Sequence, residues 1–345
     1  MRKKKILLIG PYPPPYGGVS VHIKRLRSLM SGLFDIDVID ETRIKKDGVF
    51  NLRSLNIFRY LQKVFAADIV HIHSGKFIFR LLHFFTAALF FKKKVITIHG
   101  YEPGRGDKIR TLDKIILNNC NRIIFVSKEL AAAFGSKKYF IKEAFLPPDI
   151  SDEPEIPAGV AGWIEKKKQI GYMICVANAW RLDRHNNEDL YGLDLCILAA
   201  KKLKELNTQA AFIFIVCDST GVISIEKYKQ QVKDFELEEY FLLVESPLSF
   251  IKLITKTDVV LRPTNTDGDA LTVREGLFFG KTVIASDVTF RPANTKLFRN
   301  RDSDSLAQAI AETTGHKQKN PGPVSDVTES VTSYLQFYND HIYSQ

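Results

Sequence analysis

The segment LRPTNTDGDALTVREGLFFGKTVIASD, residues 261–287, contains one complete strand–loop–helix–strand unit. An apolar strand ends at Pro263, a polar loop with a glycine follows, and the pattern predicts a helix that begins near Ala270 or Leu271. The next strand, 282–287, comes only a few residues after that helix. Strands that alternate with helices in this way predict a parallel sheet covered on both faces.

The same alternation extends in both directions along the chain. A segment rich in proline and acidic residues, 146–159, separates two series of strands and predicts a connection between domains. The strand candidates are 3–10, 34–40, 68–73, 94–100, 122–127 and 138–146 before it, and 172–179, 210–218, 240–245, 258–264 and 282–287 after it. Because single cores stop growing at about 250–300 residues, this chain length favours two domains. We therefore expect two doubly wound α/β domains, at 1–160 and 161–325, followed by a C-terminal helix at 326–345.

Composition excludes several classes of protein. A hydrophobic share of 45% and a charged share of 26% exclude a mostly disordered chain, a collagen-like chain and a coiled coil. The four cysteines lie in apolar segments and no two are spaced as CxxC, so they predict buried thiols rather than disulfides or a structural zinc site. The longest apolar stretch, 77–91, is shorter than the roughly 20 residues of a membrane-spanning helix. We therefore expect a cytoplasmic protein.

Positive charge is concentrated in the first half of the chain. Residues 1–150 carry 27 Lys and Arg against 12 Asp and Glu, whereas residues 151–345 carry 22 against 27. The asymmetry indicates an anionic partner for the first half, or else a solvated basic surface without a partner. The two candidate partners are nucleic acid and membrane phospholipid. No RNP, helix-turn-helix or zinc-finger signature supports nucleic acid, so the remaining candidate is peripheral contact with the inner face of the cell membrane. The stretch 76–94, with its aromatic and basic residues, would suit either a helix at such an interface or one packed on a sheet.

A glycine-containing loop follows the first predicted strand. Ligands of doubly wound folds bind beyond the carboxyl ends of the strands, so loops in this position should carry the chemistry. Within residues 10–23, Gly17 and Gly18 would bring backbone N–H groups close to a phosphate at the start of a helix, or would only permit a tight turn. The loop matches neither GxGxxG nor GxxxxGK[ST], so it predicts neither a dinucleotide fingerprint nor a P-loop.

Histidines end two neighbouring strands of the first half. His99 ends the strand 94–100, where it could donate to a sugar hydroxyl or transfer a proton, or could be structural. His71 and His73 alternate on the preceding strand, but no carboxylate or cysteine lies at a spacing suited to complete a metal site. We therefore expect neither a metal site nor a metal cofactor.

The acidic loop of 261–287 is the richest candidate site. Asp267 and Asp269 come just before the predicted helix, and Glu275 lies one or two turns into it. A helix N-terminus attracts a diphosphate, and carboxylates accept hydrogen bonds from the paired hydroxyls of a ribose or hexose. A simpler interpretation is that Asp267 and Asp269 only cap the helix.

At this segment the chain resembles the family 4 glycosyltransferases (glycosyl transferases group 1), which are retaining enzymes of the GT-B architecture. The family pattern has two acidic residues eight positions apart, with a glycine after the first and an E-A-x-x-x-G-x-P-V-I-A run at the second. Here it reads Asp267-Gly268 and, eight positions on, Glu275 followed by GLFFGKTVIA. The other shared features follow in the family's order: the Gly17–Gly18 loop, the His99 strand end, the segment 126–134 and the terminal helix.

The resemblance implies a fold and a set of site residues. The fold would be GT-B, with two Rossmann-like doubly wound parallel-sheet domains facing a central cleft and a C-terminal helix that packs back on the N-terminal domain. The first domain would bind the acceptor, and the second the nucleotide sugar. The implied catalytic residues are His99, Asp267, Asp269 and Arg181. The implied donor-binding residues are Gly17, Gly18, Arg181, Arg184, Arg262, Gly268, Ala270, Leu271, Thr272 and Glu275, with Glu275 on the ribose and His99 on the transferred sugar.

The chain departs from the family pattern at three positions. The first acidic residue is Asp267 where the family usually has Glu, so Asp269 is a candidate to share its role. Tyr191 stands where a lysine usually binds the diphosphate, which makes Arg184 or Arg262 the candidate to compensate. Thr282 stands where proline is common, and we expect no functional consequence.

The resemblance implies transfer of a sugar from a UDP- or GDP-sugar to a hydroxyl of a glycan or polyprenyl-linked acceptor in cell-surface polysaccharide synthesis. The anomeric configuration would be retained, and no metal would be required. Two alternatives stay open. A nucleotide-sugar 2-epimerase has a similar fold and needs no acceptor, and a non-catalytic protein that binds nucleotide sugar or an anionic surface would also explain the charge.

Overall fold

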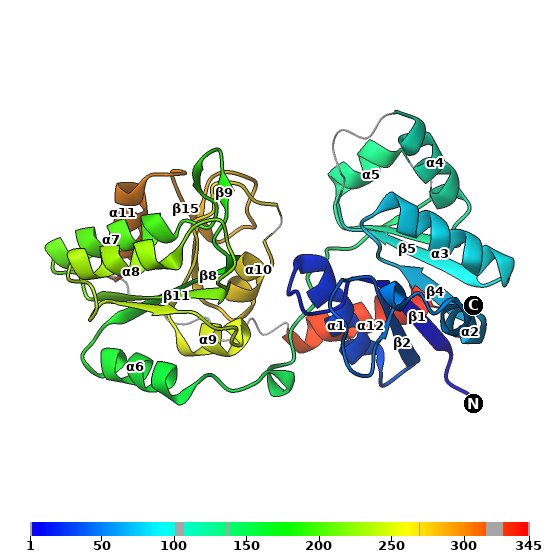
Figure 1. The fold of residues 1–345 in the computed structure, drawn as a ribbon, viewed down its shortest axis with the longest axis horizontal. Helices are drawn as coiled ribbons and strands as arrows, with labels where there is room; N and C mark the ends of the chain where they lie inside the picture. Colours follow the sequence, from blue (N-terminus) through cyan, green and yellow to red (C-terminus); the bar gives the residue numbers. More distant parts are fainter. Residues whose placement is uncertain (1, 101–106, 136–137, 269, 315–326, 344–345) are drawn as a thin grey trace. The chain divides into compact units, whose positions relative to one another are not determined.

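The computed structural model describes residues 2–100, 107–135, 138–268, 270–314 and 327–343. It divides into two compact units, of which the first contains Met1–Leu146 and Thr328–Gln345 and the second contains Pro147–Val327 (Figure 1). The division therefore falls at the start of the proline-rich segment rather than at 160. The reason is that the helix after this segment packs with the second sheet.

The first unit is built on a seven-stranded sheet in which every described pairing is parallel, in the order β3-β2-β1-β4-β5-β6-β7. Its strands are β1 (Lys5–Gly10), β2 (Asp35–Asp40), β3 (Phe50–Asn51), β4 (Ile69–Ile72), β5 (Lys93–Ile98), β6 (Arg122–Phe125) and β7 (Phe140–Ile141). The strand order reverses between β1 and β4, so the carboxyl ends of these two strands lie at the position where doubly wound folds bind ligands.

Helices cover both faces of the first sheet (Figure 1). One face packs against α2 (Ile57–Ala66), α3 (Phe77–Leu89), α4 (Asp107–Asn118) and α5 (Lys128–Phe134). The other face packs against α1 (Gly18–Met30) and the C-terminal helix α12 (Val327–Phe337), which continues as one π-helical turn, Tyr338–Ile342. Short 3-10 turns, Leu52–Ser54 and Ile150–Asp152, complete the helical elements up to the second sheet.

The C-terminal helix returns to the first unit, as the resemblance implies. Tyr334, Tyr338, Ile342 and Tyr343 are buried in the same core cluster as β1 and α1. The hydroxyl of Tyr343 also lies 2.7 Å from Nδ1 of the buried His71 on β4. Apolar burial and this hydrogen bond therefore join the end of the chain to the first sheet.

The second unit contains a six-stranded parallel sheet in the order β12-β11-β8-β13-β14-β15. Its strands are β8 (Met173–Arg181), β11 (Ala210–Asp218), β12 (Phe241–Val244), β13 (Val259–Arg262), β14 (Thr282–Ser286) and β15 (Thr295–Phe298). One face packs against α7 (Leu193–Glu205), α8 (Ile225–Asp234) and α11 (Ser303–Thr314), and the other against α6 (Ala158–Gln169), α9 (Phe250–Lys256) and α10 (Leu271–Phe278). Here the order reverses between β8 and β13, whose last residues are Arg181 and Arg262.

The expected pair of doubly wound parallel sheets is thus confirmed, and the differences are local. The predicted strand 138–146 pairs only over β7, two residues long. The structure adds β15 at the edge of the second sheet and a short antiparallel pair, β9 (Arg184–His185) with β10 (Glu188–Asp189). Among the helices that the structure describes, none is both long and apolar enough to cross a membrane.

Candidate functional site

An arginine–carboxylate cluster occupies the carboxyl edge of the second sheet. The carboxylate of Asp267 accepts hydrogen bonds from Arg262 Nε at 2.9 Å and Nη2 at 3.1 Å, and from Arg291 Nη1 at 2.8 Å. The hydroxyl of Thr264 donates to it at 3.1 Å. Two guanidinium groups and one carboxylate leave this cluster, hereafter the arginine cluster, with a net charge of +1.

The environment of Asp267 keeps its carboxyl group ionised. Burial by itself would raise the pKa of Asp267, but hydrogen bonds and charge from Arg262 and Arg291 outweigh that effect and lower it. An ionised carboxylate held by two arginines is poorly suited to donate a proton. Its evident role is to hold the two guanidinium groups side by side.

Arg291, which the sequence reasoning missed, joins two loops at this edge. Its side chain is 2% exposed, and its Nε donates to the carbonyl of Ser286 at the end of β14, at 3.2 Å. The hydroxyl of Ser286 in turn donates to the carbonyl of Thr264, at 2.6 Å. The available signal was position, because Arg291 follows the predicted strand 282–287 at the same carboxyl edge as the acidic loop.

Helix α10 starts beside the arginine cluster and lies directly on the sheet. A Cβ at Gly276 would stand 2.7 Å from Val283 Cγ2 and 3.1 Å from Val260 Cβ, so only glycine permits this close approach. The N-cap residue is Ala270, whose side chain has no group to accept from the first turn. Ala270 therefore leaves the backbone N–H groups at the start of α10 uncapped, and the predicted binding of a diphosphate at Leu271 and Thr272 stays a prediction.

Glu275 lies one turn after Thr272 on the same side of α10. Both residues are buried, with Glu275 only 5% exposed. Only a small part of Glu275 is therefore accessible to a ribose. The predicted contact with the ribose stays a prediction.

The other predicted donor residues of this unit are more exposed. Arg181 ends β8 with its side chain 49% exposed, and its Nε donates to Asp183 at 2.6 Å. Arg184 lies on β9, whose two residues are exposed, and Gly268 is exposed in the loop before α10. Asp269, predicted as catalytic, lies outside the described residues. The structure thus brings Arg262 and Asp267 into contact and leaves Arg181 paired with a different carboxylate.

The structure places Tyr191 beside the arginine cluster. The guanidinium of Arg262 lies over the ring of Tyr191, 5.8 Å from its centroid. Gly192, at φ +70°, follows, and a Cβ there would stand 2.2 Å from the carbonyl oxygen of Pro263. This close approach carries Tyr191 to the end of β13, and whether Arg262 or Arg184 compensates for the lysine stays a prediction.

In the first unit, α1 begins at Gly18, just beyond the end of β1. The space beside Gly18 is open, since a Cβ there would meet nothing within 4 Å. The backbone N–H of Gly17 is already bonded to Ser20 Oγ, at 2.9 Å. Gly18 thus has room for a ligand, and phosphate binding at Gly17 and Gly18 stays a prediction.

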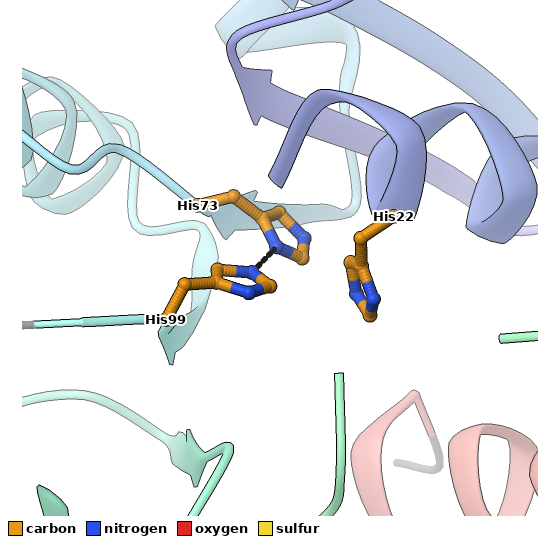
Figure 2. Close-up of side chains that lie close together, drawn as sticks. All are labelled: His22, His73 and His99. Atoms are coloured by element: carbon orange, nitrogen blue, oxygen red, sulfur yellow. Dashed lines mark hydrogen bonds between the residues drawn. The ribbon is translucent and has the colours of Figure 1, made fainter. Parts of the chain in front are cut away.

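His99 lies among other histidines at the same edge (Figure 2). Its Nε2 is 3.0 Å from Nδ1 of His73, and its ring centroid is 4.8 Å from that of His22 on α1. Burial lowers the pKa of His22 to about 4 and the pKa values of His73 and His99 well below their ordinary range. Near neutral pH these rings are uncharged, which favours a hydrogen-bonding role for His99 over proton transfer.

The sequence reasoning did not single out His22. It lies far from His73 and His99 along the chain, and the only local signal was its place on the helix that follows the Gly17–Gly18 loop. Among the described residues, His22, His73 and His99 form a group that could hold a metal ion.

Solved structures with the same architecture include several glycosyltransferases. Anabaena HepE, solved in complex with UDP-glucose, is 13% identical, with 96% of this chain and 94% of that chain covered and a TM-score of 0.62. A glycosyltransferase from Rickettsia africae is 14% identical, with coverage of 97% and 95% and a TM-score of 0.68. Sucrose-phosphate synthase from Thermosynechococcus elongatus is 14% identical, with coverage of 97% and 96% and a TM-score of 0.62.

At these identities the likeness establishes the fold alone, and that fold is GT-B. No protein-family model and no curated protein matches the chain.

Proposed function

We propose that this protein is a retaining glycosyltransferase that moves a sugar from a UDP- or GDP-sugar to a hydroxyl of a glycan or polyprenyl-linked acceptor in cell-surface polysaccharide synthesis. The observation that carries the proposal is the arginine cluster, which places a net positive charge beside the start of α10. A fold shared with HepE, which was solved with UDP-glucose, supports a nucleotide sugar as the ligand.

The arginine cluster and α10 suit the leaving diphosphate. When the bond between the anomeric carbon and the phosphate oxygen breaks, negative charge grows on that oxygen. Arg262 and Arg291 are held in place by Asp267 before a ligand arrives, so they can stabilise this charge with little rearrangement. Backbone N–H groups at Leu271 and Thr272 would add to the same effect. Arg181, at the end of β8, and Arg184, on β9, are further candidates.

No protein nucleophile is needed for retention. The acceptor oxygen forms its bond to the anomeric carbon on the face that the phosphate leaves, and its proton passes to the departing phosphate oxygen. The protein then contributes position and charge rather than a covalent intermediate. This scheme does not require a metal ion, and it agrees with an ionised Asp267 that donates no proton.

The first unit carries features suited to an anionic membrane that presents a lipid-linked acceptor. Apolar side chains are exposed along one stripe of α3 at Ile78, Leu82, Phe85 and Leu89. Phe91 is 95% exposed just beyond α3, and three lysines, 92–94, follow it. Helix α3 thus both packs on the sheet, through its opposite side, and leaves this apolar stripe exposed beside positive charge, as an interfacial helix would.

The test of the proposal compares Arg291→Lys with a matched surface variant, Arg299→Lys, in which the arginine is 78% exposed. Lysine keeps the charge of Arg291 but cannot make both hydrogen bonds that place it. We expect the Arg291→Lys protein to stay folded and to lose about 100-fold in donor-dependent turnover, whereas Arg299→Lys should match the wild type.

The same assay separates the alternatives. Isomerisation of the free donor without an acceptor would replace the proposal with a 2-epimerase, and tight donor binding without turnover across acceptors would replace it with a binding protein. Failure of UDP- and GDP-sugars to raise the melting temperature would overturn the donor site itself.

A further inference from the structure

The histidine group of the first unit has buried nitrogens that the proposed glycosyl transfer does not use. His22 comes from α1, His73 follows β4 and His99 follows β5, and their rings lie side by side (Figure 2). One ring nitrogen from each residue lies within 4.8 Å of the other two.

Two rings of this group each have one buried nitrogen without a hydrogen-bond partner, and that of His22 is a candidate ligand. His22 and His73 are 4% and 1% exposed, and Nε2 of each has no partner among the described residues. A buried polar atom left in this state loses its hydrogen bonds to water without replacing them, which is why such atoms are rare. The neighbouring His71 shows the usual structural arrangement, since its nitrogens lie 2.7 Å from Tyr343 Oη and 2.8 Å from Thr97 Oγ1.

We propose that His22, His73 and His99 bind one first-row transition-metal ion of the Zn²⁺ class. Imidazole nitrogen is a preferred ligand for Zn²⁺, Ni²⁺, Co²⁺ and Cu²⁺, and three histidines leave a fourth coordination position open to water or another oxygen ligand. This inference goes beyond the proposed function, whose chemistry does not depend on the ion.

The protonation state of His22 suits ligation. Its Nδ1 lies 2.7 Å from the carbonyl oxygen of Ala144, which can only accept, so Nδ1 carries the proton and Nε2 keeps its lone pair. A backbone carbonyl that fixes the second nitrogen in this way is a common partner of metal-bound histidine.

One pair of these nitrogens is spaced almost as in a tetrahedral site. His73 Nδ1 and His99 Nε2 are 3.0 Å apart, whereas two nitrogens bound to one Zn²⁺ at 2.0–2.1 Å are about 3.3 Å apart. An ion could therefore take the place of the proton now shared by these two rings. The unpartnered Nε2 of His22 would then be the third ligand, with Nδ1 still held by the carbonyl of Ala144.

The test titrates the untagged, metal-stripped full chain with Zn²⁺ by calorimetry and with Co²⁺ by visible absorption. We expect one ion per chain and a Co²⁺ spectrum of a four-coordinate site. His22→Asn keeps an amide N–H for the Ala144 carbonyl but removes the ligating nitrogen, so it should weaken Zn²⁺ binding by at least about 100-fold. His185→Gln alters an exposed histidine outside the group and should leave the affinity unchanged.

A second variant keeps the proposal falsifiable if His22→Asn does not fold. His99→Gln retains a polar group toward His73 and should also weaken binding by about 100-fold. Absence of saturable binding at one ion per chain, or equal affinity in the wild type and the folded variants, would overturn the metal site. Neither measurement contains a nucleotide sugar, so either result is independent of the glycosyltransferase proposal.

Discussion

Each sheet has a cluster of polar side chains at its carboxyl edge, near the two strands between which the strand order reverses. The two clusters differ in the kind of side chain and in charge. In the first unit, His22 and His73 are buried and His99 is half-buried, and all three are uncharged near neutral pH. In the second unit, Arg262 and Arg291 keep their charge and share one carboxylate. The same topology thus presents nitrogen lone pairs at the carboxyl edge of the first sheet and fixed positive charge at that of the second.

The physical cause of the difference is what each side chain can do when it is buried. A buried imidazole avoids the cost of charge by releasing its proton, as the lowered pKa of His22 shows. A guanidinium cannot release its proton under these conditions, so a buried arginine needs an acceptor. Asp267 is that acceptor for both arginines, and its predicted role toward the donor sugar stays a prediction.

Removal of the charge on Asp267 should have the largest effect. Asp267→Asn leaves two guanidinium groups facing each other without a carboxylate, so we expect the free energy of unfolding to fall by about 3–5 kcal/mol in urea titrations at pH 7. Asp304→Asn, at a side chain 78% exposed, is the control and should change little. An unchanged urea midpoint for Asp267→Asn would show that the carboxylate does not hold the arginine cluster.

The pH dependence sharpens this prediction. Because the folded-state pKa of Asp267 is lowered, its contribution to stability is fully present above its unfolded-state pKa of about 3.9 and is lost as the pH falls through the lower folded value. The wild type should therefore lose stability in this acid range more steeply than Asp267→Asn.

Two glycine variants, one in each unit, test whether the space around the glycine excludes a side chain. Gly192→Ala adds a Cβ 2.2 Å from a backbone oxygen at a residue with φ +70°, so it should lower the free energy of unfolding by at least about 2 kcal/mol. Gly18→Ala meets open space at the first residue of α1 and should leave stability unchanged or slightly raised. Equal urea midpoints in the two variants would contradict this difference.

The smallest effect is expected on the exposed face of the first unit. The double variant Phe85→Ser, Leu89→Ser removes apolar area that would enter a membrane interface, so binding to vesicles with anionic lipid should weaken about tenfold. Leu206→Ser, at an exposed leucine of the second unit, is the matched control. Binding is measured by sedimentation with the vesicles. If wild-type binding does not change with salt concentration or with the charge of the lipid, the basic surface does not contribute to it.

The local sequence pattern predicted much of the fold but a smaller part of the candidate site. Apolar strands separated by helices predicted both sheets, and the acidic loop correctly placed Asp267 and the start of α10 at a strand end. What could not be predicted is the partner of each side chain. Arg291 and His22 lie on separate segments from the residues they contact, and no local spacing reports such contacts.

The sequence by itself determined the two parallel-sheet units and the loops at their carboxyl edges, because strand and helix periodicity and glycine position are properties of short segments. Only the tertiary structure decided which charges meet and which nitrogens are left without a partner. Those outcomes depend on burial and on distances of a few ångströms between segments far apart in the chain, where the cost of desolvation selects a paired arginine in one unit and a neutral histidine in the other.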